Sequence, residues 1–137
     1  RQWRLRPLYT KSILNPNLDQ WYEVFPTTGD CMVQFMTMRN HNDETGREGQ
    51  IRVVCDGQTF LSDSLNFKKY WRYLYLNPVD ETLETEGGTG GASDDPIVNL
   101  AAFKYPWVAQ SMKISARRTE YWPSENSLEF RTRYWSL

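Results

Sequence analysis

The chain has 137 residues, a formal net charge of −1 from 16 basic and 17 acidic side chains, and an aromatic content of 15%. This length is typical of one domain, and the balanced charge argues against general nucleic-acid binding, which requires a strongly basic surface. The sequence holds no run of 18 apolar residues, so we expect no transmembrane helix. It opens on Arg1 without a signal-peptide pattern, and we interpret it as a processed product or an excised segment.

Short alternating segments bounded by proline begin the chain. Trp3 and Leu5 alternate with arginines before Pro7, and residues 21–25 alternate in the same way before Pro26. Because the side chains of a strand point to opposite faces with a period of two, both segments are predicted to be strands.

Residues 31–61 are predicted to form a three-stranded antiparallel meander that the rest of the chain covers or extends. Residues 31–38 are apolar on both faces, which is typical of a central strand, and residues 51–56 alternate between apolar and polar side chains. Asp56-Gly57 follows and is a strong hairpin signal, because a type I′ turn requires positive φ at both central positions.

Both cysteines lie in this predicted meander. In the expected register Phe35 faces Cys55, which places Cys31 roughly 13 Å from Cys55 at about 3.4 Å per residue. A disulfide requires Cα atoms within about 7 Å of each other. We therefore expect two free thiols, with a bridged pair as the alternative.

The middle of the chain combines a strand, an unusual acidic segment and a helix signal. Residues 70–76 alternate and are predicted to be a strand, whereas residues 80–95 hold six acids and four glycines. Such a segment buries too little to offset its ordering entropy, so we expect a mobile excursion. Asp95-Pro96 then suits the cap and first position of a short helix near 96–104.

The C-terminal third is predicted to be a second hairpin, with strands over residues 112–117 and 128–135. About eight short strands with closely spaced turns favour an all-β fold, an antiparallel β-sandwich of jelly-roll type. We expect residues 1–137 to form this sandwich as a single domain.

No catalytic, nucleotide or metal signature is present, so we predict a non-catalytic protein without a cofactor or metal. His41 is the only histidine, and a zinc site needs three or four ligands. The glycines within residues 87–91 lie among acids, which repel phosphate. A carboxylate pair drawn from Glu120, Glu125 or Glu129 would allow acid–base hydrolysis, which ranks last among the functions considered.

The outer face of the last hairpin is the first candidate binding surface. Lys113 and Arg117 on one strand, with Arg131 and Arg133 on the next, are predicted to share one solvent-facing side that ends at Trp135. Arginine beside an exposed aromatic ring is a good anchor for carboxylates, sulfates or the acidic patch of a partner. The alternative is ordinary cross-strand pairing with acidic neighbours.

The loop over residues 121–126 is the second candidate. Tyr121 and Trp122 at a loop tip stiffened by Pro123 are suited to stack on sugar rings or fill a pocket of a partner. The alternative is a lid over the edge of the sandwich.

A strand, a polar loop and then residues 51–57 (IRVVCDG) resemble β-sandwich carbohydrate-binding modules and, equally, jelly-roll capsid and capsid-protrusion domains. The resemblance implies a β-sandwich rather than one activity. We predict a recognition or attachment domain, extracellular or on a virion surface, that binds a glycan or protein receptor. The alternative is a structural coat or assembly subunit that associates with copies of itself, and we expect a homo-oligomer.

Overall fold

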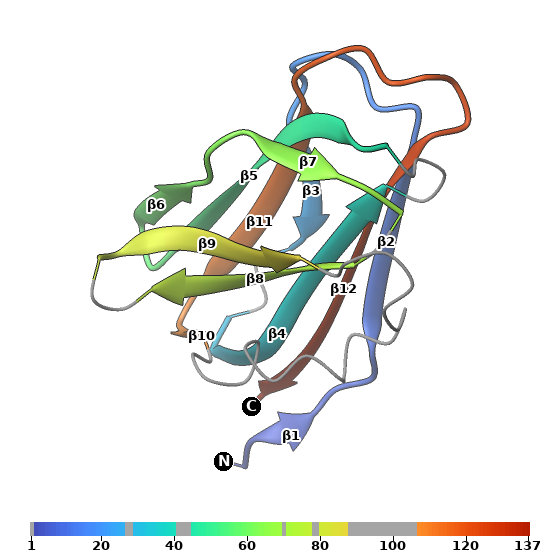
Figure 1. Cartoon of the computed structure of the whole chain (residues 1–137). Helices are drawn as coiled ribbons and strands as arrows, with labels where there is room; N and C mark the ends of the chain where they lie inside the picture. The colour runs from blue at the N-terminus through green and yellow to red at the C-terminus, as the bar shows by residue number, and fades with distance from the viewer. Residues whose placement is uncertain (1, 27–28, 41–44, 70, 78–79, 88–106) are drawn as a thin grey trace.

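The computed structural model describes residues 2–26, 29–40, 45–69, 71–77, 80–87 and 107–137. These segments form two antiparallel β-sheets packed face to face (Figure 1). The predicted antiparallel sandwich is therefore confirmed. No helix occurs within these ranges, and the helix expected near 96–104 lies outside them.

Sheet A is the larger sheet, with β4 and β12 side by side at its centre. β1 and β2 pair with the other side of β12, β8 and β10 pair with the other side of β4, and β9 pairs with β8. Its strands are β1 (Arg4–Leu5), β2 (Tyr9–Leu14), β4 (Cys31–Asn40), β8 (Arg72–Asn77), β9 (Thr82–Gly87), β10 (Trp107–Ala109) and β12 (Ser127–Ser136).

Sheet B has β5 and β11 at its centre. β3 pairs with the other side of β11, and β6 and β7 pair one after the other with the other side of β5. Its strands are β3 (Tyr22–Phe25), β5 (Arg47–Cys55), β6 (Gln58–Leu61), β7 (Leu65–Phe67) and β11 (Met112–Arg118).

The chain crosses repeatedly from one sheet to the other. Sheet A contains the order β2-β12-β4-β8 and sheet B the order β3-β11-β5-β6, so that β2 to β5 alternate between the sheets. Two four-stranded sheets connected in this way form a jelly roll. β1, β9 and β10 extend the edges of sheet A.

The core lies between the two sheets and takes alternate side chains of the long strands. Met36 of β4 and Ile51 of β5 are fully buried in one cluster. Phe25 packs against Tyr9 and Tyr134, with ring centroids 5.3 and 5.2 Å away. Each large apolar side chain buried in this way stabilises the fold by about 1.5–3 kcal/mol, so this core holds the sheets together.

The predicted meander is partly right. β5 and β6 form the hairpin expected at Asp56-Gly57, where φ is 51° and 82°, as a type I′ turn requires. The preceding strand does not join this hairpin, because β4 belongs to sheet A. β4 is central in that sheet, and a β-bulge between Val33 and Phe35 shifts the alternation, so that Cys31, Val33, Met36 and Met38 all face the core.

The predicted C-terminal hairpin is wrong. β11 lies in sheet B and β12 in sheet A, so the two strands do not pair and the segment between them crosses one end of the sandwich. Alternation shows which side chains of a strand share a face, but it does not show which sheet the strand joins.

Cys31 and Cys55 are free thiols, as expected, although the register used to reach this prediction is wrong. Cys31 is in β4 of sheet A and Cys55 is in β5 of sheet B. In the predicted acidic excursion, residues 82–87 form β9, which pairs with β8. Residues 88–95 lie outside the described ranges, and the mobility of that part stays a prediction.

Candidate functional site

Glu120 and Glu129, which were considered for hydrolysis, have structural partners. Glu129 pairs with Arg39 at 2.7 Å, and Oε1 of Glu120 accepts a hydrogen bond from the backbone N–H of Glu48 at 2.7 Å. Among the described residues, no group of three or more His, Cys, Asp or Glu side chains is placed to hold a metal ion. His41 lies outside those residues.

Cys55 does not have the lowered thiol pKa of a reactive cysteine. Burial, with the Asp56 carboxylate as a smaller cause, raises the pKa of the Cys55 thiol above its usual value. A reactive cysteine needs a lowered pKa, because the thiolate is the nucleophile. In the described part of the chain, no helix is long and apolar enough to cross a membrane.

The four cations predicted to share one face lie on opposite sides of the sandwich. Lys113 and Arg117 project from β11 on the outer face of sheet B, whereas Arg131 and Arg133 project from β12 on the outer face of sheet A. The prediction of one common cationic face is therefore wrong. A binding role for any of the four stays a prediction.

On the outer face of sheet A, two arginines stack on one tryptophan, and we call this cluster the sheet A stack. Cζ of Arg39 lies 4.5 Å and Cζ of Arg131 lies 4.6 Å from the ring centre of Trp71, which is 1% exposed. Nε of Arg39 donates a hydrogen bond to Oε1 of Glu129 at 2.7 Å. Arg131, predicted to bind a partner, thus packs within the protein itself.

On the outer face of sheet B, two other arginines stack on Trp21, and we call this cluster the sheet B stack. Cζ of Arg52 lies 4.3 Å and Cζ of Arg117 lies 4.7 Å from the Trp21 ring centre, and the ring is only partly buried. Nε and a terminal nitrogen of Arg117 both donate to Oε1 of Gln50, at 3.1 and 2.6 Å. Gln50 is neutral, so no carboxylate offsets these two charges within the cluster.

Lys113 lies on the same face of sheet B and is paired. Its Nζ is 3.3 Å from Oε2 of Glu23, and both side chains are about half exposed. An exposed pair of this kind contributes little to stability, about 0–1 kcal/mol. The sequence did not single out Trp21 or Arg52, because their proximity to Arg117 depends on the pairing of β5 with β11.

The loop over residues 121–126 separates its two aromatic side chains. Tyr121 is 72% exposed, whereas Trp122 is 3% exposed. Nε1 of Trp122 donates to the carbonyl oxygen of Glu48 at 2.9 Å, and its ring lies 6.1 Å from that of Phe67. Trp122 is therefore a core residue, and Tyr121 alone presents an aromatic ring at the loop tip.

A row of apolar side chains crosses the outer face of sheet A at one end, and we call it the apolar row. In the strand register, Leu5 pairs with Trp135, Trp135 with Met32, and Met32 with Val108. Directly paired residues of antiparallel strands point to the same face. Cys31, the neighbour of Met32 in β4, is fully buried, so the row faces away from the core.

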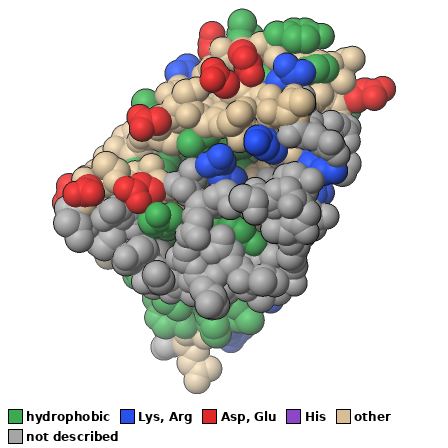
Figure 2. Space-filling model, viewed as in Figure 1, with side chains coloured by type: hydrophobic (Ala, Val, Ile, Leu, Met, Phe, Trp, Pro, Cys, Tyr) green, Lys and Arg blue, Asp and Glu red, His purple; other side chains and the backbone are tan. Residues whose placement is uncertain are grey.

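The apolar row is open to solvent at both ends. Val108 is 61% exposed, Leu5 is exposed, and Met32 and Trp135 are partly buried. Figure 2 shows hydrophobic surface gathered at the end of the molecule where Figure 1 places β10 and the C terminus. Exposed apolar side chains gathered in one patch are typical of interaction surfaces. The sequence pointed to Trp135 alone, because the row combines four strands that are distant along the chain.

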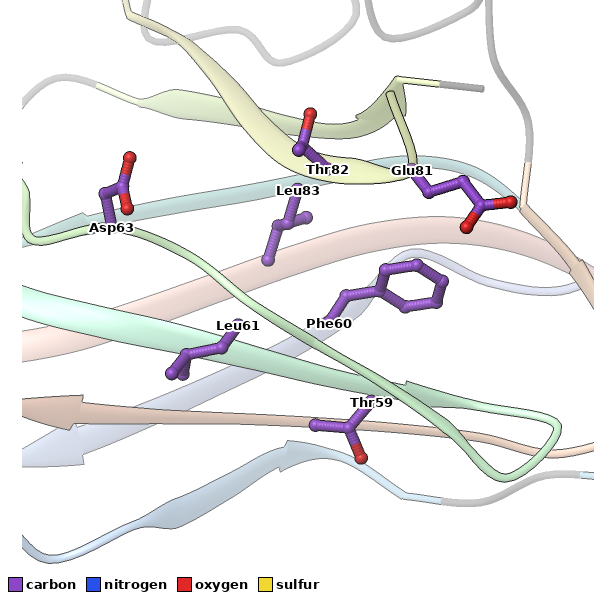
Figure 3. A pocket seen from close by; sticks show the side chains of 7 residues that line it. All are labelled: Thr59, Phe60, Leu61, Asp63, Glu81, Thr82 and Leu83. Atoms are coloured by element: carbon purple, nitrogen blue, oxygen red, sulfur yellow. The ribbon is translucent and has the colours of Figure 1, made fainter. Parts of the chain in front are cut away.

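A cleft of about 190 Å³ lies between the edge strands β6 and β9. Phe60 and Leu83 line its interior, and Asp63 and Glu81 lie at its two ends (Figure 3). Small-molecule sites usually measure about 300–1,000 Å³. The cleft therefore has the size for a side chain of a partner rather than for a cofactor.

Comparison with known proteins gives one likeness. No protein-family model and no curated protein matches this chain. Among solved structures, it resembles a chain of the "Acidic stable capsid structure of Helicobacter pylori bacteriophage KHP30", with 11% sequence identity, a TM-score of 0.48, and coverage of 98% of this chain and 92% of that chain. This likeness assigns no role to any residue of the chain.

Proposed function

We propose that the chain is a structural, non-catalytic jelly-roll subunit that associates with copies of itself in a coat or similar assembly. The sequence offers this function as the alternative to receptor recognition, and we rank it first. The supporting observation is the apolar row on the outer face of sheet A.

The apolar row can supply useful but limited association energy. Burying one Leu, Val, Met or Phe side chain contributes about 1.5–3 kcal/mol. Met32 and Trp135 are already partly buried, so they contribute less than their full size. Association costs about 4–15 kcal/mol in lost freedom of motion, so the row supports a contact of modest strength. An extended assembly therefore needs at least one further contact.

Val108→Glu tests the proposal by placing a carboxylate in the most exposed position of the row. We expect it to lower the mass of the oligomer in sedimentation velocity and multi-angle light scattering. The melting temperature should change little, because an exposed side chain contributes little to the fold.

Leu14→Glu is the matched control, because Leu14 is also an exposed apolar residue of sheet A but lies on β2, outside the row. It should assemble as the wild type does. A wild-type protein that stays monomeric at its highest soluble concentration would contradict the proposal, as would equal masses for the wild type and Val108→Glu.

Recognition of a glycan or protein receptor is the second candidate function. The specific observation in its favour is Tyr121, which is 72% exposed at a loop tip. Binding on a glycan array that disappears in Tyr121→Ala would support this function. An array without any binding would leave self-association as the better proposal.

A further inference from the structure

One strip of side chains across sheet B passes from basic to acidic, and we call it the charged strip. It begins at Arg117 and Trp21 and continues through Arg52 of β5. Leu61 of β6 follows, as the direct cross-strand partner of Arg52, and it is exposed on the same face. Asp63, which lies at one end of the β6–β9 cleft, ends the strip.

The charges at both ends of the strip lack an opposite charge in the described part of the molecule. Neither Arg52 nor Arg117 forms an ion pair there, and the donors of Arg117 go to the neutral Gln50. Asp63 is exposed, and its carboxylate forms no ion pair or hydrogen bond within the same residues. An opposite charge from outside the chain would therefore stabilise each end.

A strip with cations at one end, a leucine in the middle and an acid at the other end is complementary to itself. In a two-fold contact, the same patch of two copies meets, so that residue i contacts j and residue j contacts i. We propose that two copies of the chain associate through the charged strip, with Leu61 near the axis and Arg52 of each copy binding Asp63 of the other. This inference rests on the proposed function, since it takes the partner to be a second copy.

The edge of sheet B favours a second copy over a small anion as the occupant. Among the described strands, β6 (Gln58–Leu61) pairs with β5 alone, and its sequence contains neither a charged residue nor a proline. Charged residues and prolines usually prevent an edge strand from pairing with another chain.

The strip and the apolar row lie on the outer faces of different sheets. One two-fold contact ends at a dimer, whereas a subunit with two separate contacts joins two neighbours and extends the assembly. The charged strip therefore supplies the further contact that the apolar row requires.

The test uses the Val108→Glu protein, so that the apolar row does not contribute to the measured mass. This protein should form a dimer through the charged strip. Adding Arg52→Glu, or adding Asp63→Arg, places like charges opposite each other and should weaken the dimer at least about tenfold. Mixing these two variants pairs opposite charges at both positions, so a heterodimer should form that native mass spectrometry resolves from either variant alone.

Two controls separate contact from folding. Arg52→Glu and Asp63→Arg combined in one chain should restore the dimer, and Arg4→Glu, which changes an exposed arginine on β1, should leave it intact. A heterodimer on mixing supports the proposal even if each single change lowers the melting temperature.

Three results would overturn the inference: a monomeric Val108→Glu protein, a dimer unaffected by Arg52→Glu, or no heterodimer on mixing. Loss of dextran sulfate binding in Arg52→Glu without a change of mass would assign the strip to an anionic polymer instead. The proposed function itself is judged separately, by Val108→Glu against Leu14→Glu in the otherwise wild-type chain.

Discussion

The outer faces of the two sheets carry the same side-chain arrangement in different surroundings. Trp71, just before β8 of sheet A, and Trp21, just before β3 of sheet B, each hold two arginines within 4.3–4.7 Å of the ring centre. Trp71 is almost fully buried and its cluster includes Glu129, whereas Trp21 is partly exposed and its cluster includes the neutral Gln50. The comparison indicates that the sheet A stack stabilises the fold, whereas the sheet B stack is available to a partner.

The physical difference lies in desolvation and charge balance. A guanidinium over an exposed ring gains about 0.5–1 kcal/mol, and over a desolvated ring about 2 kcal/mol or more. Removing a charge from water is costly unless an opposite charge lies beside it. Glu129 supplies the opposite charge for Arg39. The sheet B stack keeps access to water, so its charges need no internal partner.

Truncating each tryptophan is the strongest way to test this comparison. Trp71→Ala should lower the free energy of unfolding by about 3–5 kcal/mol, because it removes a buried ring and both stacked contacts. Trp21→Ala should cost about 1–2 kcal/mol, the sum of two exposed stacked contacts. Urea unfolding of both variants measures the difference, and equal losses would contradict the distinction between the two faces.

Removing one carboxylate from each sheet gives a smaller effect. Glu129→Gln removes the carboxylate that pairs with Arg39, and since the two side chains are only 22% and 13% exposed, we expect a loss of about 1–3 kcal/mol. Glu23→Gln breaks the Lys113 pair, whose side chains are 44% and 49% exposed, and should cost under about 1 kcal/mol. Chemical unfolding in low and high salt checks this. Salt screens exposed charges, so only the exposed pair should stabilise the fold less in high salt. A larger loss for Glu23→Gln would reverse the order.

The reactivity of the two cysteine thiols, one in each sheet, is the smallest difference that we expect between the sheets. Because burial raises the pKa of Cys55, the folded protein should react with a thiol reagent more slowly than a free cysteine does, and faster as the pH rises. The fully buried Cys31 should react only after unfolding.

The pH dependence of stability has a definite sign. The raised pKa means that the contribution of Cys55 to stability is complete below the unfolded value of 9.0 and is lost as the pH rises through the folded value. Comparing the urea unfolding of the wild type and Cys55→Ser between neutral and alkaline pH measures this. Recovery of a Cys31–Cys55 linked peptide from non-reduced protein would contradict the free-thiol state.

Local patterns in the sequence determined much of each strand. The alternation over residues 51–56 and the Asp56-Gly57 turn predicted the β5–β6 hairpin, and the structure confirms it. The outward directions of Lys113 and Arg131 were also predicted, because the period of two applies within any one strand. The class of fold followed from the number and spacing of such segments.

Only the tertiary structure decided which strands share a sheet, and with it every candidate surface. The apolar row joins Leu5 to Trp135, and the sheet B stack joins Trp21 to Arg117, so both depend on pairings between distant segments. The sequence determined the two faces of each strand because neighbouring side chains set them locally. It did not determine the surfaces, because the choice of partner strand depends on how the whole chain buries its apolar faces.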